Sequence, residues 1–116
     1  MIKATGIDIV RIKRIKEAVE KWGERFLSRI YSQDELRYCL QKNPPYESLA
    51  VRFAAKEAFL KAINKRLSLT SIEVKNEPSG RPYLNVKDNF PQNLRFHLSL
   101  SHDSDYAIAI VIVEEV

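Results

Sequence analysis

The sequence predicts an α+β domain in which helices pack on a mostly antiparallel sheet. Two short stretches that break regular secondary structure, "NPP" at 43–45 and "PSG" at 78–80, divide the 116 residues into segments. Apolar residues recur mainly at helical spacing up to about residue 65, whereas the later residues alternate apolar and polar side chains as strands do. A chain of this length has material for one core, so we expect residues 1–116 to form a single domain.

Three secondary-structure elements are expected before the "NPP" stretch at 43–45. Residues 2–10, "IKATGIDIV", have the composition of a strand. The next stretch, 11–31, predicts one helix whose apolar face carries Ile12, Ile15, Val19 and Trp22. Ser32 then begins a short helix over 32–41, because Glu35 follows at the spacing of a capping box.

The long helix expected from about 46 to 65 has two charged side chains, Lys56 and Glu57, within an otherwise apolar run. At 100° per residue, Lys56 falls on a stripe of bulky side chains, and Glu57 falls where that stripe meets a face of alanines. In one interpretation Lys56 extends its amine to solvent and Glu57 pairs with Lys61. In the other, Glu57 is a functional carboxylate, since a buried ion must be paired, hydrogen-bonded or bound to a metal. The spacing leaves both open.

The second half predicts four strands. Residues 71–76 and 81–86 alternate around the turn at Pro78, Ser79 and Gly80, which is typical of a hairpin. Residues 95–115 supply two more strands, and "AIAIVIV" at 107–113 is apolar on both faces. We expect this last strand to be central in its sheet and expect its apolar excess to favour self-association.

The composition indicates a folded, water-soluble protein, with 45% apolar and 29% charged residues. The lone Cys39 excludes an internal disulfide and a zinc cluster, fits a reducing cytoplasm, and is expected to be a packing residue. No apolar run approaches the roughly 18 residues of a membrane span, and the first residues lack a signal-peptide pattern. A cytoplasmic protein is expected.

The net charge of +4 is concentrated in "RIKRIK", where basic side chains occupy positions 11, 13, 14 and 16. Such a patch suits an acidic protein or phosphate groups. The other open explanation is a solvated helix face, since Lys13 can pair with Glu17 and Lys16 with Glu20. Aromatic residues do not interleave with these cations, so nucleic acid is disfavoured as a partner.

Asp8, like Glu57, is a carboxylate within an apolar segment, because it lies between Ile7 and Ile9 in an otherwise apolar strand. Two carboxylates, with waters and substrate phosphates, are the usual protein ligands of Mg²⁺. Taken singly, each has a structural explanation, such as hydrogen bonds from Asp8 to backbone amides. Other residues suited to phosphate chemistry are Arg52, Lys56, Lys61, Gly80, Arg81, His102 and Asp103.

Four motifs in this order resemble the holo-acyl-carrier-protein synthase family, the small bacterial phosphopantetheinyl transferases. They are "GIDIVRIKRI", "RFAAKEAFLKA", "SGRPYL" and "HLSLSHDSDYAIAIVIVE", and together they extend from Gly6 to Glu114. A lone Lys-Glu-Ala would be weak support, whereas four motifs in sequence make a strong combined signal.

The resemblance implies transfer of the 4′-phosphopantetheine arm of coenzyme A to a serine of acyl carrier protein, with release of 3′,5′-ADP and with Mg²⁺ as cofactor. It implies that the metal ligands are Asp8 and Glu57. It implies that the phosphates lie near Lys56 and Lys61, and that the nucleotide contacts Arg52, Gly80, Arg81, Pro82 and His102. The residues expected at the reacting groups are Glu57, Lys61, His102 and Asp103, and the base that accepts the serine proton stays open between Glu57, His102 and a water.

The resemblance also implies a homotrimer with sites between subunits and no membrane contact. Its basic first helix would dock the acidic carrier protein through Arg11, Lys13 and Arg14. The chain departs from the family in the segment 64–70, "NKRLSLT", which has no glycine where a glycine-rich loop is usual, so no contacts can be transferred there. Arg81 stands where lysine is common, and a guanidinium still suits phosphate.

Two other function classes stay open at the level of sequence. A noncatalytic adaptor would use "RIKRIK" to bind an acidic protein, with its carboxylates in structural ion pairs and no dependence on Mg²⁺. A small nucleic-acid-binding domain would show steeply salt-dependent binding of oligonucleotides and no response to coenzyme A.

Overall fold

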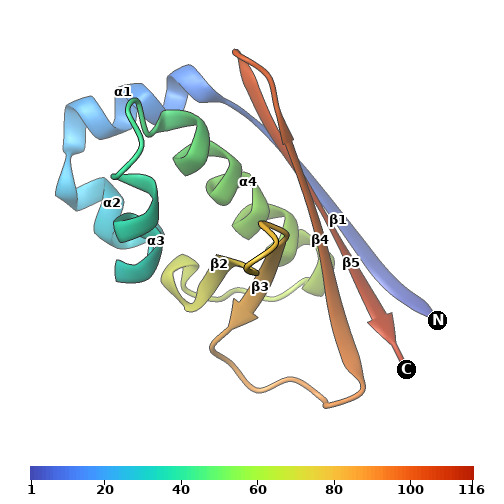
Figure 1. Cartoon of the computed structure of the whole chain (residues 1–116). Helices are drawn as coiled ribbons and strands as arrows, with labels where there is room; N and C mark the ends of the chain where they lie inside the picture. Colours follow the sequence, from blue (N-terminus) through green and yellow to red (C-terminus); the bar gives the residue numbers. More distant parts are fainter.

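The computed structural model, which describes residues 1–116, has four helices on one side of a three-stranded sheet, with the longest helix packed directly against the sheet (Figure 1). A separate two-stranded hairpin lies at one end of the helical layer. The α+β prediction is confirmed. The elements in chain order are β1 (Ile2–Arg11), α1 (Ile12–Trp22), α2 (Glu24–Ile30), α3 (Gln33–Cys39), α4 (Tyr46–Ile63), a 3₁₀ turn η1 (Leu69–Ser71), β2 (Ile72–Asn76), β3 (Pro82–Val86), β4 (Leu94–His102) and β5 (Tyr106–Glu115).

Strand β5 is the central strand of the larger sheet, as predicted, and pairs antiparallel with both β1 and β4. Its two faces differ. Small side chains at Ala107 and Ala109 are fully buried on the inner face, whereas Ile108 and Ile110 are exposed on the outer face. The outer face of β1 is apolar too, because Ile7 and Ile9 are more than half exposed.

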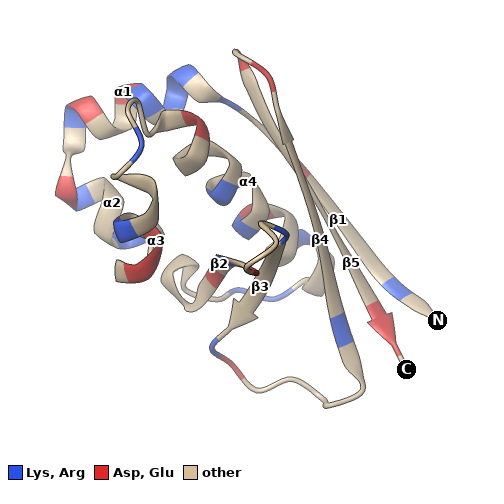
Figure 2. Cartoon of the chain, in the orientation of Figure 1, with Lys and Arg blue, Asp and Glu red and all other residues tan.

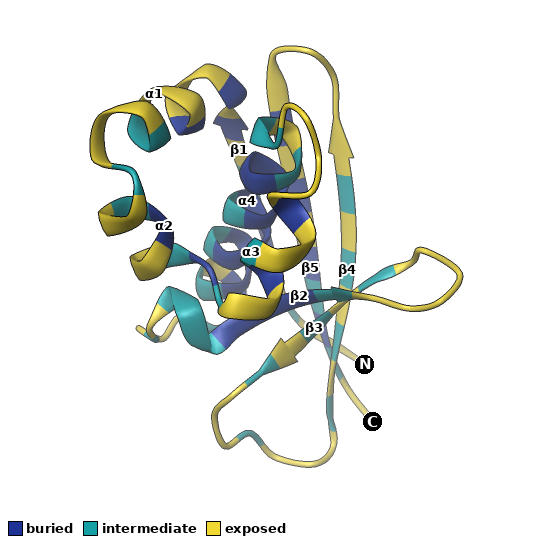
Figure 3. Ribbon diagram, turned by 60° about the vertical axis from the view of Figure 1, so that its left-hand side comes forward, coloured by how far each residue is buried: buried dark blue, intermediate teal, exposed yellow.

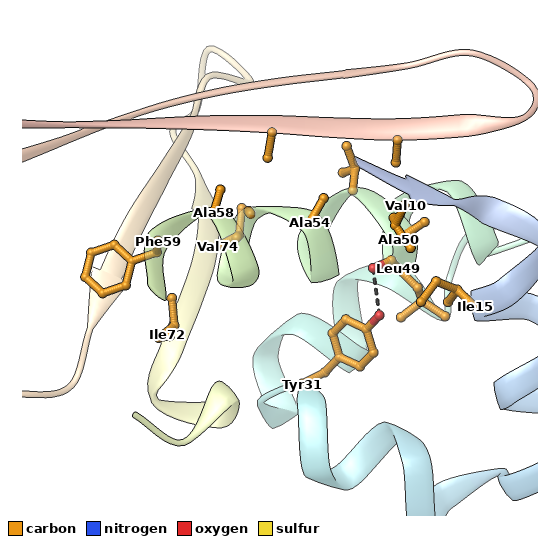
Figure 4. Packing of buried hydrophobic residues seen from close by; sticks show 14 of the residues in the cluster. Val10, Ile15, Tyr31, Leu49, Ala50, Ala54, Ala58, Phe59, Ile72 and Val74 are labelled. Atoms are coloured by element: carbon orange, nitrogen blue, oxygen red, sulfur yellow. Dashed lines mark hydrogen bonds between the residues drawn. The ribbon is translucent and has the colours of Figure 1, made fainter. Parts of the chain in front are cut away.

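Helix α4 is the centre of the domain, and buried residues gather on it and on the strands behind it (Figure 3). The alanine face predicted from the sequence lies toward the strands, with Ala50, Ala54 and Ala58 in the packing layer (Figure 4). Gly6 on β1 makes the close approach possible, because a Cβ there would lie 2.0 Å from the carbonyl oxygen of Ala58. This contact brings the next residues of β1, including Asp8, beside α4.

The helix predicted over 11–31 is wrong in one respect, because it is two helices that break at Gly23. Gly23 has φ 53°, a conformation that suits a residue without Cβ, and its N–H donates to the carbonyl of Val19 at the end of α1. The change of direction leaves Trp22 48% exposed rather than on the apolar face, while Ile12 and Ile15 are buried as predicted.

The helix start at Ser32 is confirmed with both bonds of a capping box. Ser32 Oγ accepts the N–H of Glu35, and Glu35 Oε1 accepts the N–H of Ser32. Cys39 at the end of α3 is fully buried beside Ser48, which agrees with a packing role. No helix of the chain has the length and apolar character that crossing a membrane requires.

Candidate active site

The fold brings Asp8 of β1 and Glu57 of α4 together with Lys61, one helical turn after Glu57. Lys61 Nζ donates to Asp8 Oδ1 and to the carbonyl oxygen of Ile7, both at 3.0 Å. Glu57 itself forms no ion pair, so the predicted pair between Glu57 and Lys61 is not formed. Burial raises the pKa of Glu57, and the nearby Asp8 carboxylate raises it further, while Lys61 opposes both effects. The site therefore holds two neighbouring carboxylates and one cation.

Lys56 lies in the interior, where no part of its side chain is exposed. Its ammonium donates to Glu35 Oε1 at 2.6 Å, to the carbonyl oxygen of Leu69 at 2.9 Å and to that of Ile72. Burial lowers the pKa of Lys56, and the Glu35 carboxylate opposes that shift. All three donors of the ammonium are engaged. Lys56 therefore neither reaches solvent nor offers a proton to a phosphate, in contrast to both expectations from the sequence.

A hollow of about 540 Å³ opens beside Glu57 and Lys61. Its lining continues into the segment after α4 with Asn64, Lys65 and Arg66. Lys65 pairs with Asp88 at 2.8 Å, whereas Arg66 is exposed and has no ion pair. The segment that lacks the family's glycines thus supplies basic side chains. The "NKR" run at 64–66, which begins three residues after Lys61, was the signal in the sequence that could have identified them.

A second hollow, of about 440 Å³, gathers four of the residues expected at the nucleotide: Arg52, Gly80, Pro82 and His102. It shares no lining residue with the first hollow. Arg81 does not line it and lies instead on an adjoining groove between β3 and β4. Sequence analysis missed the further lining residues Tyr38, Lys42, Pro44, Glu47, Ser48, Val51, Asn76 and Leu100, because they come from five separate stretches of the chain.

His102 and Asp103 adjoin in sequence but face different partners. His102 Nδ1 lies 3.0 Å from Glu47 Oε2 at the second hollow. Asp103 Oδ1 accepts the backbone N–H groups of Asp105 and Tyr106, both at 2.7 Å, and these hydrogen bonds hold the pKa of Asp103 below its ordinary value. Within one chain, Asp103 therefore shapes the turn between β4 and β5.

The basic residues at the start of α1 are exposed, and they form a cluster of positive charge where β1 runs into the helix (Figure 2). Arg11 ends β1, and its guanidinium donates to the hydroxyl of Tyr106 at 2.9 Å. Lys13 and Arg14 form no ion pair. The pairs expected from helical spacing, Lys13 with Glu17 and Lys16 with Glu20, are not formed, so these cations stay available to a partner.

Comparison with known proteins identifies the family. Residues 4–111 match the family model described as the 4′-phosphopantetheinyl transferase superfamily. This chain belongs to that superfamily. Within it, a holo-(acyl-carrier-protein) synthase of Halothermothrix orenii is 46% identical over 99% of this chain and 99% of its own length. Another, from Chloroherpeton thalassium, is 48% identical over 94% of this chain and 95% of its own length. The resemblance drawn from four motifs is confirmed.

Solved structures of these phosphopantetheinyl transferases share the fold over at least 95% of this chain. The holo-(acyl-carrier-protein) synthase of Bacillus anthracis, in complex with CoA (3′,5′-ADP), has a TM-score of 0.86 at 34% identity and covers 100% of this chain and 99% of its own. The enzyme of Helicobacter pylori, in complex with coenzyme A, has a TM-score of 0.80 at 34% identity over 95% and 99% of the two chains.

Proposed function

We infer that this protein is a holo-acyl-carrier-protein synthase of fatty acid synthesis. It transfers the 4′-phosphopantetheine arm of coenzyme A to a serine of acyl carrier protein and releases 3′,5′-ADP. The inference rests mainly on the family match over residues 4–111. The geometry of the site agrees with that match, because Asp8 and Glu57 lie together with Lys61 beside a hollow lined by basic residues. Phosphoryl transfer depends mainly on positioning and charge stabilisation, and this arrangement offers both.

Asp8 and Glu57 would hold Mg²⁺. The donor set fits this ion, because two neighbouring carboxylates supply hard oxygen ligands, and Mg²⁺ is commonly held by one or two carboxylates together with waters and substrate phosphates. When bound, Mg²⁺ supplies positive charge that offsets the negative charge of the phosphates. Without a bound metal, the raised pKa of Glu57 reflects first the cost of burying its carboxylate and second its repulsion from Asp8.

The chain's own cations would orient coenzyme A. Lys61 is more than half exposed beside the carboxylates and can turn from Asp8 toward a phosphate oxygen. Arg66 lines the same hollow without an ion pair. The second hollow would take the nucleotide part, since Arg52 lines it as a buried guanidinium that no carboxylate neutralises. Lys56 is left out of the binding site, because its ammonium is fully engaged in the interior.

The working protein would be a homotrimer with its sites between subunits. The outer face of the sheet supports association, because Ile7, Ile9, Ile108 and Ile110 form an exposed apolar face on β1 and β5. The stoichiometry of three rests on the family resemblance. In this arrangement one subunit supplies Asp8 and Glu57, and its neighbour supplies His102 and Asp103.

The carrier protein would dock on the exposed basic start of α1, through Arg11, Lys13 and Arg14. An acidic partner is favoured over a solvated-face role, because the intrahelical ion pairs that would occupy these lysines are not formed.

Mass spectrometry tests the proposed function directly. Apo acyl carrier protein is incubated with coenzyme A and this protein, with and without Mg²⁺, and the carrier should gain the mass of one phosphopantetheine only when Mg²⁺ is present. Binding of the carrier without any mass gain would favour a noncatalytic adaptor instead.

A further inference from the structure

Arg52 of α4 is a buried cation without a counterion. The residue is only 4% exposed, and it forms no ion pair with a carboxylate. The guanidinium donates to Ser48 Oγ and to Asn76 Oδ1, both at 2.9 Å, while its Nε has no hydrogen-bond partner. Burying a charge among neutral partners alone is costly, so another group must help to stabilise it.

The ring of Tyr38 is that group. The guanidinium carbon of Arg52 lies 4.4 Å from the ring centroid, within the range of a cation–π contact. Lys42 places its ammonium 4.9 Å from the same centroid. The hydroxyl of Tyr38 makes no hydrogen bond within the chain. The π-face, rather than the hydroxyl, is therefore what this residue contributes.

Both cations line the hollow of about 440 Å³, and Tyr38 lines it with them. Neither Arg52 nor Lys42 has a carboxylate partner, and the one carboxylate of the lining, Glu47, is engaged by His102 at 3.0 Å. Two like charges near one hollow repel each other, and a shared ring lowers the cost of holding both there. The hollow is thereby kept ready for an anion.

We propose that Tyr38 is a positioning residue for coenzyme A, whose ring holds Arg52 and Lys42 in place to bind the anionic nucleotide part. This inference rests on the proposed function. Tyr38 acts through the two cations, so its loss should weaken binding of the nucleotide and leave the chemical step intact. A residue with a purely structural role would instead change stability, kcat and both KM values together.

The test compares Tyr38→Leu and Tyr38→Met, which remove the ring, with Tyr38→Phe, which keeps it. Calorimetric titration with 3′,5′-ADP measures binding without carrier protein, and transfer kinetics give kcat and the KM for each substrate. Loss of the ring should weaken 3′,5′-ADP binding and raise the KM for coenzyme A by about three- to thirtyfold, the range of a cation–π contact. The kcat and the KM for carrier protein should change little, and Tyr38→Phe should match wild type.

Tyr46→Leu is a matched control, because Tyr46 carries a cation–π contact with Lys16 and does not line the hollow. It should leave 3′,5′-ADP binding unchanged. Wild-type affinity in both Tyr38→Leu and Tyr38→Met, or an equal loss in Tyr38→Phe, would overturn the proposal. Failure of wild type to transfer phosphopantetheine at all would overturn the proposed function instead, so the two failures are distinguishable.

Discussion

The two lysines of α4's sequence signature form ion pairs of opposite character. The pair between Lys56 and Glu35 has an N–O distance of 2.6 Å, and its side chains are 0% and 1% exposed. The pair between Lys61 and Asp8 has a distance of 3.0 Å, and its side chains are 57% and 17% exposed. The first connects α4 to α3, η1 and β2, whereas the second lies open beside a hollow.

This difference shows that a charge in an apolar run does not reveal its role by position alone. Every donor of the Lys56 ammonium is used inside the protein, and Glu35 also accepts the backbone N–H groups of Ser32 and Val74. Lys61 retains solvent contact and can exchange one oxygen partner for another. The buried pair therefore supports the fold, and the open pair is suited to binding.

The largest expected effect tests the buried pair. Lys56→Met leaves the Glu35 carboxylate buried without a counterion, so the free energy of unfolding should fall by about 3–5 kcal/mol. Urea denaturation measures it. Adding Glu35→Gln should recover part of the loss. Lys61→Met is the matched control and should cost no more than about 1 kcal/mol, as exposed pairs do. Equal stability of the two single variants would break the comparison.

The next effect tests the open site. Asp8→Asn and Glu57→Gln should each lower kcat/KM by at least about a hundredfold, as loss of a charge-stabilising group does, while the protein stays folded. Transfer assays over a range of Mg²⁺ concentrations measure this, with circular dichroism to check the fold. Glu24→Gln, an exposed carboxylate at the start of α2, is the control. A folded Glu57→Gln protein with full activity would refute the metal assignment.

A smaller effect concerns the exposed cations at the start of α1, which form no ion pairs. Arg14→Glu should raise the KM for carrier protein severalfold and leave that for coenzyme A nearly unchanged, because exposed charges chiefly guide encounter. Kinetics at two salt concentrations measure it, since screening shortens the reach of a charge to about 8 Å at physiological ionic strength. Wild type should respond to salt more strongly than the variant. Equal changes in both KM values would mean that the carrier docks elsewhere.

The smallest effect concerns the pH dependence of stability. Because the folded-state pKa of Glu57 is raised, its favourable contribution to stability is complete below the ordinary glutamate pKa and is lost as pH rises through the raised value. Ionised Glu57 therefore destabilises the metal-free protein at neutral pH. Glu57→Gln should raise Tm near pH 7 by about one to three degrees, with the gain disappearing in acid.

Adding Mg²⁺ sharpens this last test. The ion should raise the Tm of wild type, because it binds the folded state, and should have little effect on the Tm of Glu57→Gln. A lower Tm for Glu57→Gln than for wild type at neutral pH without metal would contradict the assignment of a repulsive carboxylate pair.

Local patterns by themselves determined much of this protein. The capping box at Ser32 and Glu35 depends on residues three apart, and the alternation of apolar and polar side chains along β4 depends on residues two apart, so short stretches of sequence are enough to predict both. The order of the four motifs was sufficient to indicate the family and, through it, the activity. The break at Gly23 was missed, because one glycine costs a helix only about 1 kcal/mol and packing decides whether the helix continues.

The tertiary structure alone decided what each charged side chain touches. Lys56 meets a carboxylate 21 residues away in the chain, and Lys61 meets one 53 residues away. Arg52 rests on a ring from another helix. Periodicity can place a lysine on a face of a helix, but its burial, and hence the electrostatic cost that requires a partner, depends on which distant segments cover that face. The same residue type in one helix thus supports the fold at one position and binds phosphate, in our proposal, at another.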